Sequence, residues 1–350
     1  MSETLKEDMR GALADVNIPW DEFRNGVVLV TGATGLVGGA LLRVLSAANA
    51  EYGLNLRMVA HGRDKAKGEA IARECGAEFF RGDIRRPETA ESMAGMADRL
   101  DYVFHCAAIT KSADMAARPA DVTDTEVCGT RNMLKLSLER RCRGFVYLSS
   151  MEVYGRTDLP EVRESDLGYL DLSNPRSCYP ESKRFCETLC AACVAQYGLP
   201  VKIARPAQTF GAGTPKDDTR VFAGFARSAL ARENIVLHTE GRSRGNYCYA
   251  TDAVRGLLTI LLRGKDGEAY NVANPAASAT IREMAEVVAN EICGGGIKVV
   301  VGVPDDIQKY GYAPDVGHRL NADKLMSLGW KPKHGLAEMY KRMLADWKHL

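Results

Sequence analysis

The chain has 350 residues, of which 46% are hydrophobic and 26% charged, a globular composition long enough for one large domain and a smaller one. Its formal net charge of +1 excludes the strongly basic surface typical of proteins that bind nucleic acid or anionic membranes. No stretch approaches the roughly 20 apolar residues of a membrane span, and residues 1–20 lack an apolar signal core. We therefore expect a cytoplasmic protein whose ten cysteines are reduced.

From about residue 26 onward, short apolar runs alternate with segments of helical periodicity. Near-continuous apolar strands that alternate with helices are typical of a parallel sheet covered on both faces. The sequence therefore predicts an α/β fold, a doubly wound parallel sheet of Rossmann type, followed by a smaller C-terminal portion. The expected strands are 27–31, 56–60, 78–80, 102–105, 145–148 and 201–204, and the expected helices include 36–48, 65–75 and 179–197.

A glycine-rich turn follows the first expected strand directly, with glycines spaced as Gly-x-x-Gly-x-x-Gly. Glycine lets the backbone turn tightly and approach a pyrophosphate with no Cβ in the way, and the following helix N-terminus supplies free amides. The strand–turn–helix context predicts a dinucleotide site. Its predicted residues are Gly32, Thr34, Gly35, Leu36, Val37 and Gly38.

The ends of the next two strands bear on which dinucleotide is bound. Folds of this kind usually place an acidic residue after the second strand to bind the ribose hydroxyls, but Ala60-His61-Gly62-Arg63 stands there. Arg63 favours a 2′-phosphate, which makes NADP an alternative to NAD, and it is equally compatible with a solvated surface position. Asp83 and Ile84, after the third strand, are candidate contacts to the adenine end; Asp83 can instead cap the following helix.

Tyr179-Pro180-Glu181-Ser182-Lys183 places a phenol and an ammonium four residues apart on one helical face. A phenol with a pKa of about 10 is a poor base at neutral pH, but a neighbouring ammonium favours the phenolate, so the pair can accept a hydroxyl proton. Ser150 follows the fifth strand, at the sheet edge where ligands bind, and can hydrogen-bond the same substrate oxygen. These residues predict the oxidation of a hydroxyl.

Together, the glycine turn, Ala107-Ala108, the Ser-Ser-x-x-Val-Tyr-Gly segment 149–155 and the Tyr-x-x-x-Lys pattern resemble the extended short-chain dehydrogenase/reductase family. The match is to its NAD-dependent nucleotide-sugar epimerases, dehydratases and decarboxylases. It runs from about residue 26 to the end and includes Arg205-Pro206, 247–252 and 328–330.

The resemblance implies a catalytic set and a quaternary structure. Ser150 would be the active-site hydroxyl, with Tyr179 the base and Lys183 its partner, both also touching the cofactor. Ala107, Ala108 and Pro206 would line the cofactor site. The family usually holds NAD tightly, acts on nucleotide sugars and forms homodimers through helices like the one bearing Tyr179. The helix face of Cys186, Cys190 and Cys193 is a candidate for that interface.

The family's first step is oxidation at C4 of the sugar, after which three routes diverge. Returning hydride to the other face inverts C4, a carboxylate on C5 permits loss of carbon dioxide, and elimination gives a dehydrated sugar. Dehydratases of the family carry adjacent Asp and Glu where this chain has Met151-Glu152. Because a thioether cannot transfer protons, Met151 argues against dehydration. Glu152 is either catalytic or a structural loop contact, and Pro175-Arg176-Ser177-Cys178-Tyr179 is similar to nucleotide-sugar decarboxylases.

We expect a nucleotide-sugar C4 epimerase. A nucleoside-diphosphate uronate (UDP-glucuronate) decarboxylase, an NADPH-dependent 4-keto-sugar reductase and a non-catalytic dinucleotide-sensing protein are the alternatives.

Three departures from the family pattern concern the substrate. Gln208 replaces an Asn, Gly245 replaces an Arg, with Arg244 one residue earlier, and Glu126 replaces the usual Asn before Gly129-Thr130. The candidate substrate contacts are Lys111, Gln208, Arg244 and Arg319, in part because a guanidinium suits a diphosphate; for Lys111 and the arginines a surface position is equally open.

We divide the chain into an N-terminal extension (1–25), a dinucleotide-binding domain with the Tyr/Lys pair (26–206) and a mainly substrate-binding portion (207–350) that partly returns to the main sheet.

Overall fold

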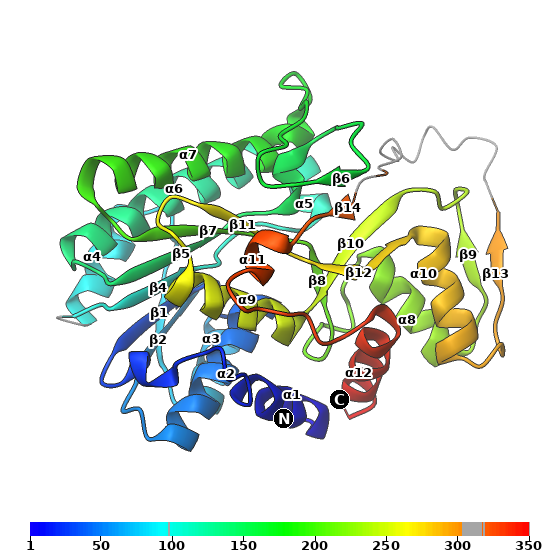
Figure 1. Cartoon of the computed structure of the whole chain (residues 1–350), viewed down its shortest axis with the longest axis horizontal. Helices are drawn as coiled ribbons and strands as arrows, with labels where there is room; N and C mark the ends of the chain where they lie inside the picture. Colours follow the sequence, from blue (N-terminus) through cyan, green and yellow to red (C-terminus); the bar gives the residue numbers. More distant parts are fainter. Residues whose placement is uncertain (97–98, 303–316, 318, 350) are drawn as a thin grey trace.

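The computed structural model describes residues 1–96, 99–302, 317 and 319–349, and it shows a large sheet-based unit beside a smaller unit (Figure 1). The large unit contains a seven-stranded sheet in which every neighbouring pair of strands is parallel. This confirms the predicted doubly wound parallel sheet. In sheet order the strands are β11 (Ala269–Val272), β7 (Val201–Pro206), β5 (Gly144–Leu148), β4 (Tyr102–His105), β1 (Val27–Thr31), β2 (Arg57–Gly62) and β3 (Glu78–Arg81).

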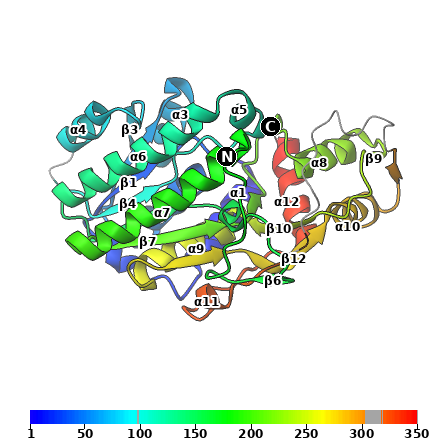
Figure 2. The same cartoon turned by 90° about the horizontal axis from the view of Figure 1, so that it is seen from above.

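Helices cover both faces of this sheet (Figures 1 and 2). Every residue of β1 and of β4 is buried, which explains why these runs are apolar without alternation. The helices on one face are α4 (Pro87–Met96), α6 (Pro119–Glu139) and α7 (Cys178–Tyr197), and those on the other are α2 (Leu36–Tyr52), α3 (Lys65–Cys75) and α9 (Ala250–Arg263).

The helix that carries the Tyr-x-x-x-Lys pattern ends as its sequence predicts. Gly198 caps α7 in the left-handed conformation, with φ of 65°, and its N–H donates to the Val194 carbonyl. The cysteine face of α7 points inward: Cys186 and Cys190 are fully buried in the core between the helices and the sheet. These two thiols therefore do not face outward, and their suggested place in a dimer interface is wrong.

The smaller unit has a core of its own, in which the Phe210 ring stacks on Phe222 at 4.5 Å between centroids. The chain after residue 206 serves both units, because β11 and α9 belong to the main sheet layers. Elements of the smaller unit are β8 (Gln208–Phe210), β9 (Ile235–Leu237), β10 (Arg244–Tyr249), β12 (Asn274–Thr280), β13 (Val299–Val301), α8 (Val221–Ala231), α10 (Ile281–Val287), η4 (Val288–Ile292) and α12 (Leu336–His349). The remaining elements are α1 (Glu3–Leu13), η1 (Trp20–Phe23), α5 (Ser112–Ala117), η2 (Met151–Tyr154), β6 (Glu161–Val162), η3 (Pro175–Ser177), β14 (Arg319–Leu320) and α11 (Asp323–Met326).

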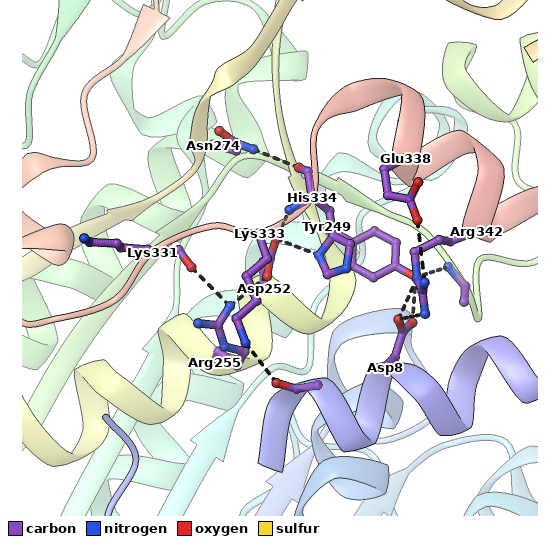
Figure 3. Close-up of polar contacts among 12 residues, drawn as sticks. Asp8, Tyr249, Asp252, Arg255, Asn274, Lys331, Lys333, His334, Glu338 and Arg342 are labelled. Atoms are coloured by element: carbon purple, nitrogen blue, oxygen red, sulfur yellow. Dashed lines mark hydrogen bonds and ion pairs between the residues drawn. The ribbon is translucent and has the colours of Figure 1, made fainter. Parts of the chain in front are cut away.

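The N-terminal helix α1 packs against helices of both units, namely α2 and α9 of the larger and α12 of the smaller (Figure 1). Asp8 of α1 is buried and accepts hydrogen bonds from the Tyr249 hydroxyl at 2.6 Å and from Arg342 Nε at 2.8 Å (Figure 3). These contacts tie the start of the chain to β10 and to the last helix.

A second polar group lies just beyond α1. Asp15 accepts from Arg255 Nε at 2.6 Å, and Arg255 Nη1 also donates to Asp252 at 2.9 Å. Asp252 in turn accepts from the backbone N–H and from Nδ1 of His334, both at 3.0 Å. We call these residues the N-terminal clamp; its members are Asp8, Asp15, Tyr249, Asp252, Arg255, His334 and Arg342.

Within the described part of the chain, no helix is long and apolar enough to cross a membrane.

Candidate active site

A cavity of about 510 Å³ opens at the carboxyl ends of the sheet strands, where an open α/β sheet binds its ligands. It collects residues from many separate stretches of the chain, and most of the predicted site residues line it. These are Gly32, Thr34, Gly35, Leu36, Val37, Gly38, Arg63, Asp83, Ile84, Ala107, Ala108, Ser150, Glu152, Tyr179, Lys183, Pro206 and Gln208.

The glycine turn is sterically obligatory. Gly32 has a φ of +67°, and a Cβ there would lie 2.6 Å from the Cys106 carbonyl oxygen. A Cβ on Gly38 would lie 2.4 Å from the Gly32 carbonyl oxygen. Gly35 begins α2, and among the described residues no side chain caps this end, which leaves helix amides available to a phosphate. The residues present therefore fit the pyrophosphate of a dinucleotide.

The adenosine end of the cavity carries no free acidic group at the second strand. His61 is buried and hydrogen-bonded to the Gly82 carbonyl at 3.1 Å, and burial lowers its pKa to about 4, so the ring is neutral. Asp64 caps α3 by accepting from the Lys67 N–H at 3.1 Å. Arg63 therefore stands in the place of the usual acid.

Asp83 lines the cavity but is already paired. Its carboxylate accepts from Arg85 at 2.7 Å, and this hydrogen bond lowers the pKa of Asp83. Its backbone carbonyl accepts from the Thr89 hydroxyl at 2.8 Å, which secures the start of α4. Asp83 therefore combines a structural role with a position where a ligand contact is open to it.

Tyr179, Lys183 and Ser150 meet at the far end of the cavity. Burial raises the pKa of Tyr179 to about 12, against the opposing effects of the Lys183 ammonium and a hydrogen bond with Ser150. Ser150 Oγ accepts from the Glu152 N–H at 3.1 Å, which orients the hydroxyl so that its proton is free to donate. Lys183 Nζ donates to the Leu148 carbonyl at 2.7 Å, so the ammonium is held under the end of β5.

Glu152, the other predicted catalytic residue, pairs with Arg176 at 3.0 and 3.2 Å. Both side chains remain more than one-third exposed, so this pair adds little stability and either group can exchange partners for a ligand. The pair places a carboxylate in the cavity that Tyr179 also lines.

Two charged residues, Glu126 and Arg220, are at the site although the sequence analysis did not predict them as site residues. Glu126 of α6 lies 2.7 Å from Lys183 Nζ and is completely buried; its replacement of an Asn was noted in the sequence, but its contact was not foreseen. Arg220 lines the cavity from the smaller unit, paired with Asp218 at 2.6 Å and stacked over Phe222. The only signal for Arg220 was a charge near the Gly211–Pro215 loop, which does not distinguish it from a surface arginine.

Three predicted substrate contacts do not line the cavity. Lys111 is exposed at the start of α5. Arg244 donates to the Ser278 carbonyl at 3.1 Å and pairs with Glu283 at 3.2 Å, so it is committed to the smaller unit. Arg319 is exposed on β14, next to β6. Their predicted roles are therefore without support from the cavity geometry.

Comparison with known proteins places the chain in context. Residues 28–273 match the model of the NAD dependent epimerase/dehydratase family. UDP-glucuronic acid decarboxylase 3 of Arabidopsis thaliana is 30% identical over 325 residues, covering 92% of this chain and 89% of that protein. The dTDP-D-glucose 4,6-dehydratase of Bos taurus is 26% identical over 342 residues, covering 95% and 93%. The UDP-glucose 4-epimerase of Thermotoga maritima, solved with UDP-glucose, has a TM-score of 0.78 at 22% identity, covering 92% of this chain and 99% of that one, a likeness of fold.

Proposed function

Because the chain belongs to the NAD dependent epimerase/dehydratase family, we propose that it oxidises the C4 hydroxyl of a nucleotide sugar and that decarboxylation of a nucleoside-diphosphate uronate follows. The observation that carries the first step is the meeting of Tyr179, Lys183 and Ser150 in the cavity that begins at the glycine turn. When bound, NAD supplies the acceptor for the C4 hydride. The turn residues and Arg63 would hold its pyrophosphate and adenosine ends.

The proton of the C4 hydroxyl passes to Tyr179 Oη as the C–H bond breaks. Lys183 favours the phenolate electrostatically, and Ser150 donates a hydrogen bond to the sugar oxygen. In a 4-keto uronate the C5–C6 bond then breaks, carbon dioxide leaves, and the electron pair forms an enolate on the C4 oxygen. The hydrogen bonds of Ser150 and Tyr179 stabilise that oxygen. C5 then takes up a proton from solvent water, and Tyr179 returns its proton to the C4 oxygen when the ketone is reduced.

Support for decarboxylation comes from the Glu152–Arg176 pair and from the relatives. The Arg176 guanidinium, 3.0 Å from the Glu152 carboxylate of the cavity lining, offers a partner for a substrate carboxylate. UDP-glucuronic acid decarboxylase 3 of Arabidopsis thaliana is 30% identical over 92% of the chain. Met151 leaves dehydration without its second acid-base group.

Epimerisation, the outcome we expected from the sequence, is the second candidate, and one observation favours it. The Arg176 guanidinium is already paired with Glu152, at 3.0 and 3.2 Å. A uronate carboxylate would have to displace Glu152 from it, whereas inversion at C4 of a neutral hexose requires no cation.

The deciding experiment incubates the NAD-loaded chain with UDP-glucuronate and, separately, with UDP-, dTDP-, CDP- and GDP-hexoses, and follows products by proton NMR. We expect a nucleotide pentose and carbon dioxide from UDP-glucuronate, with no net reduction of NAD. A C4-inverted hexose with intact UDP-glucuronate would establish the epimerase instead. Stoichiometric consumption of NADPH would indicate a 4-keto-sugar reductase, and failure to alter any nucleotide sugar would overturn both candidates.

A further inference from the structure

Glu126 is a buried carboxylate directly beneath the catalytic pair. It projects from α6, its Oε2 lies 2.7 Å from Lys183 Nζ, and both side chains are at most 2% exposed. The Tyr147 hydroxyl donates a weak hydrogen bond to the same oxygen at 3.4 Å. Glu126 Oε1 is buried and has no hydrogen-bond partner among the described residues. A carboxylate buried with an unsatisfied oxygen is costly and needs a compensating role.

We propose that Glu126 is a positioning residue of the catalytic pair: it fixes the Lys183 ammonium beneath Tyr179 and competes with the Tyr179 oxygen for the positive charge of that ammonium. This inference rests on the proposed role of Tyr179 as the base. Lys183 Nζ is held from below by Glu126 and by the Leu148 carbonyl, each at 2.7 Å, and lies 5.6 Å from the centre of the Tyr179 ring.

The charges around the pair support this arrangement. Burial opposes the Lys183 ammonium, but attraction by Glu126 and Tyr179 more than offsets it and raises the pKa of Lys183. Burial raises the pKa of Glu126, against the attraction of the ammonium. Since Glu126 is an acid 2.7 Å from an ammonium, we take the pair as ionised, and its negative charge then adds to the effect of burial in keeping Tyr179 protonated.

The other groups that face this cluster do not supply a competing charge, with one exception. Burial lowers the pKa of His105 to about 3 and raises the pKa values of Tyr147 and Cys186, so all three are neutral at pH 7. The exception is Glu152 of η2, which also disfavours the phenolate. The groups facing Tyr179, Lys183 and Glu126 are thus Ser150 and Glu152 at the cavity, His105 and Cys106 of the β4 edge, Tyr147 of β5, and Cys186 and Thr130 of the flanking helices.

The test compares Glu126→Gln, which keeps the shape and removes the charge, with Asp124→Asn, which removes an exposed charge two residues away on the same helix. The full chain, loaded with NAD, is labelled with 3-fluorotyrosine. Its phenol is more acidic than that of tyrosine and therefore titrates at a less alkaline pH. The Tyr179 resonance is assigned by its loss in Tyr179→Phe, and its pH titration is followed by fluorine NMR.

We expect the Tyr179 titration to move down by about one pH unit or more in Glu126→Gln and to stay in place in Asp124→Asn. An unchanged or higher midpoint in Glu126→Gln would overturn the inference. Should that variant fail to fold, Glu126→Asn also removes the charge and is read in the same way. The titration needs no substrate, so it tests the role of Glu126 even if the protein turns over no nucleotide sugar. If a nucleotide sugar is turned over, the acid limb of the pH profile of kcat/KM should move in the same direction as the Tyr179 titration.

Discussion

The catalytic pair and the N-terminal clamp both bury ionised side chains, and they satisfy these groups differently. In the clamp each carboxylate oxygen has a donor: Asp252, for example, accepts from Arg255, from the His334 ring and from two backbone N–H groups. At the catalytic pair Glu126 has one oxygen with no partner among the described residues. A satisfied network fixes a structure, whereas an undersupplied one keeps its groups responsive to a ligand.

The pKa directions of Asp252 and Glu126 follow this difference, although burial also raises the pKa of Asp8 in the clamp. Burial opposes ionisation of Asp252, but hydrogen bonding and attraction from His334, with the backbone N–H groups, outweigh it and lower the pKa of Asp252. Glu126 has too few donors to offset burial, and its pKa is raised. The clamp therefore contributes to holding α1, α9 and α12 together. The carboxylate whose burial is not fully compensated, Glu126, lies instead beneath Tyr179, the proposed base.

Removing the phenol of each network in turn tests whether catalysis depends on one of them alone. Tyr179→Phe should lower kcat by about 10³-fold, since it deletes the proposed proton acceptor. Tyr249→Phe removes an equally buried hydroxyl, which donates to Asp8 in the clamp, and should leave kcat within about twofold while lowering stability by about 1.5–3 kcal/mol. Turnover is measured on the nucleotide sugar identified by NMR. Comparable losses of kcat in the two variants would mean that catalysis is not confined to one network.

The second prediction concerns the clamp alone. Arg255→Met leaves Asp15 and Asp252 buried without their guanidinium, and should lower the free energy of unfolding by about 3–5 kcal/mol. Denaturant unfolding followed by circular dichroism measures this. Arg263→Met, on the same helix but exposed, is the matched control and should stay within about 0.5 kcal/mol. A loss no larger than that of the control would show that the clamp is not a source of stability.

The sequence predicted the features that depend on local pattern. The glycine turn, the strand ends and the Tyr179–Lys183 pair were foreseeable because each is a short motif whose context, a parallel sheet, fixes where it lies. The expected helix 65–75 and strand 102–105 have the same bounds in the structure. These are the elements whose apolar periodicity is decided within a few residues.

What the sequence could not supply are contacts between distant segments. Asp15 and Arg255 lie 240 positions apart, and nothing in either neighbourhood identifies the other. Arg244 looked suited to a diphosphate, but a register shift in β10 between Gly245 and Tyr247 accompanies its contacts with Ser278 and Glu283. Glu126 was visible as an unusual residue, and only the packing of α6 on α7 brought it to Lys183.

The smallest expected effect distinguishes Asp252 of the clamp from Glu126 by the sign of their pH dependence. Because the folded-state pKa of Asp252 is lowered, the stability it contributes is present above its ordinary pKa of 3.8 and lost as the pH falls through the folded value. Because that of Glu126 is raised, its contribution is present below its ordinary pKa of 4.5 and lost as the pH rises toward the folded value. The difference in unfolding free energy between the wild type and Asp252→Asn should therefore decrease as the pH falls. The difference between the wild type and Glu126→Gln should decrease as the pH rises toward neutrality. Each difference changes by at most about 1.4 kcal/mol per pH unit. Parallel slopes from pH 3 to 7 would mean that both carboxylates sit in equivalent environments, which would remove the distinction between a network that fixes the fold and one that is poised for proton transfer.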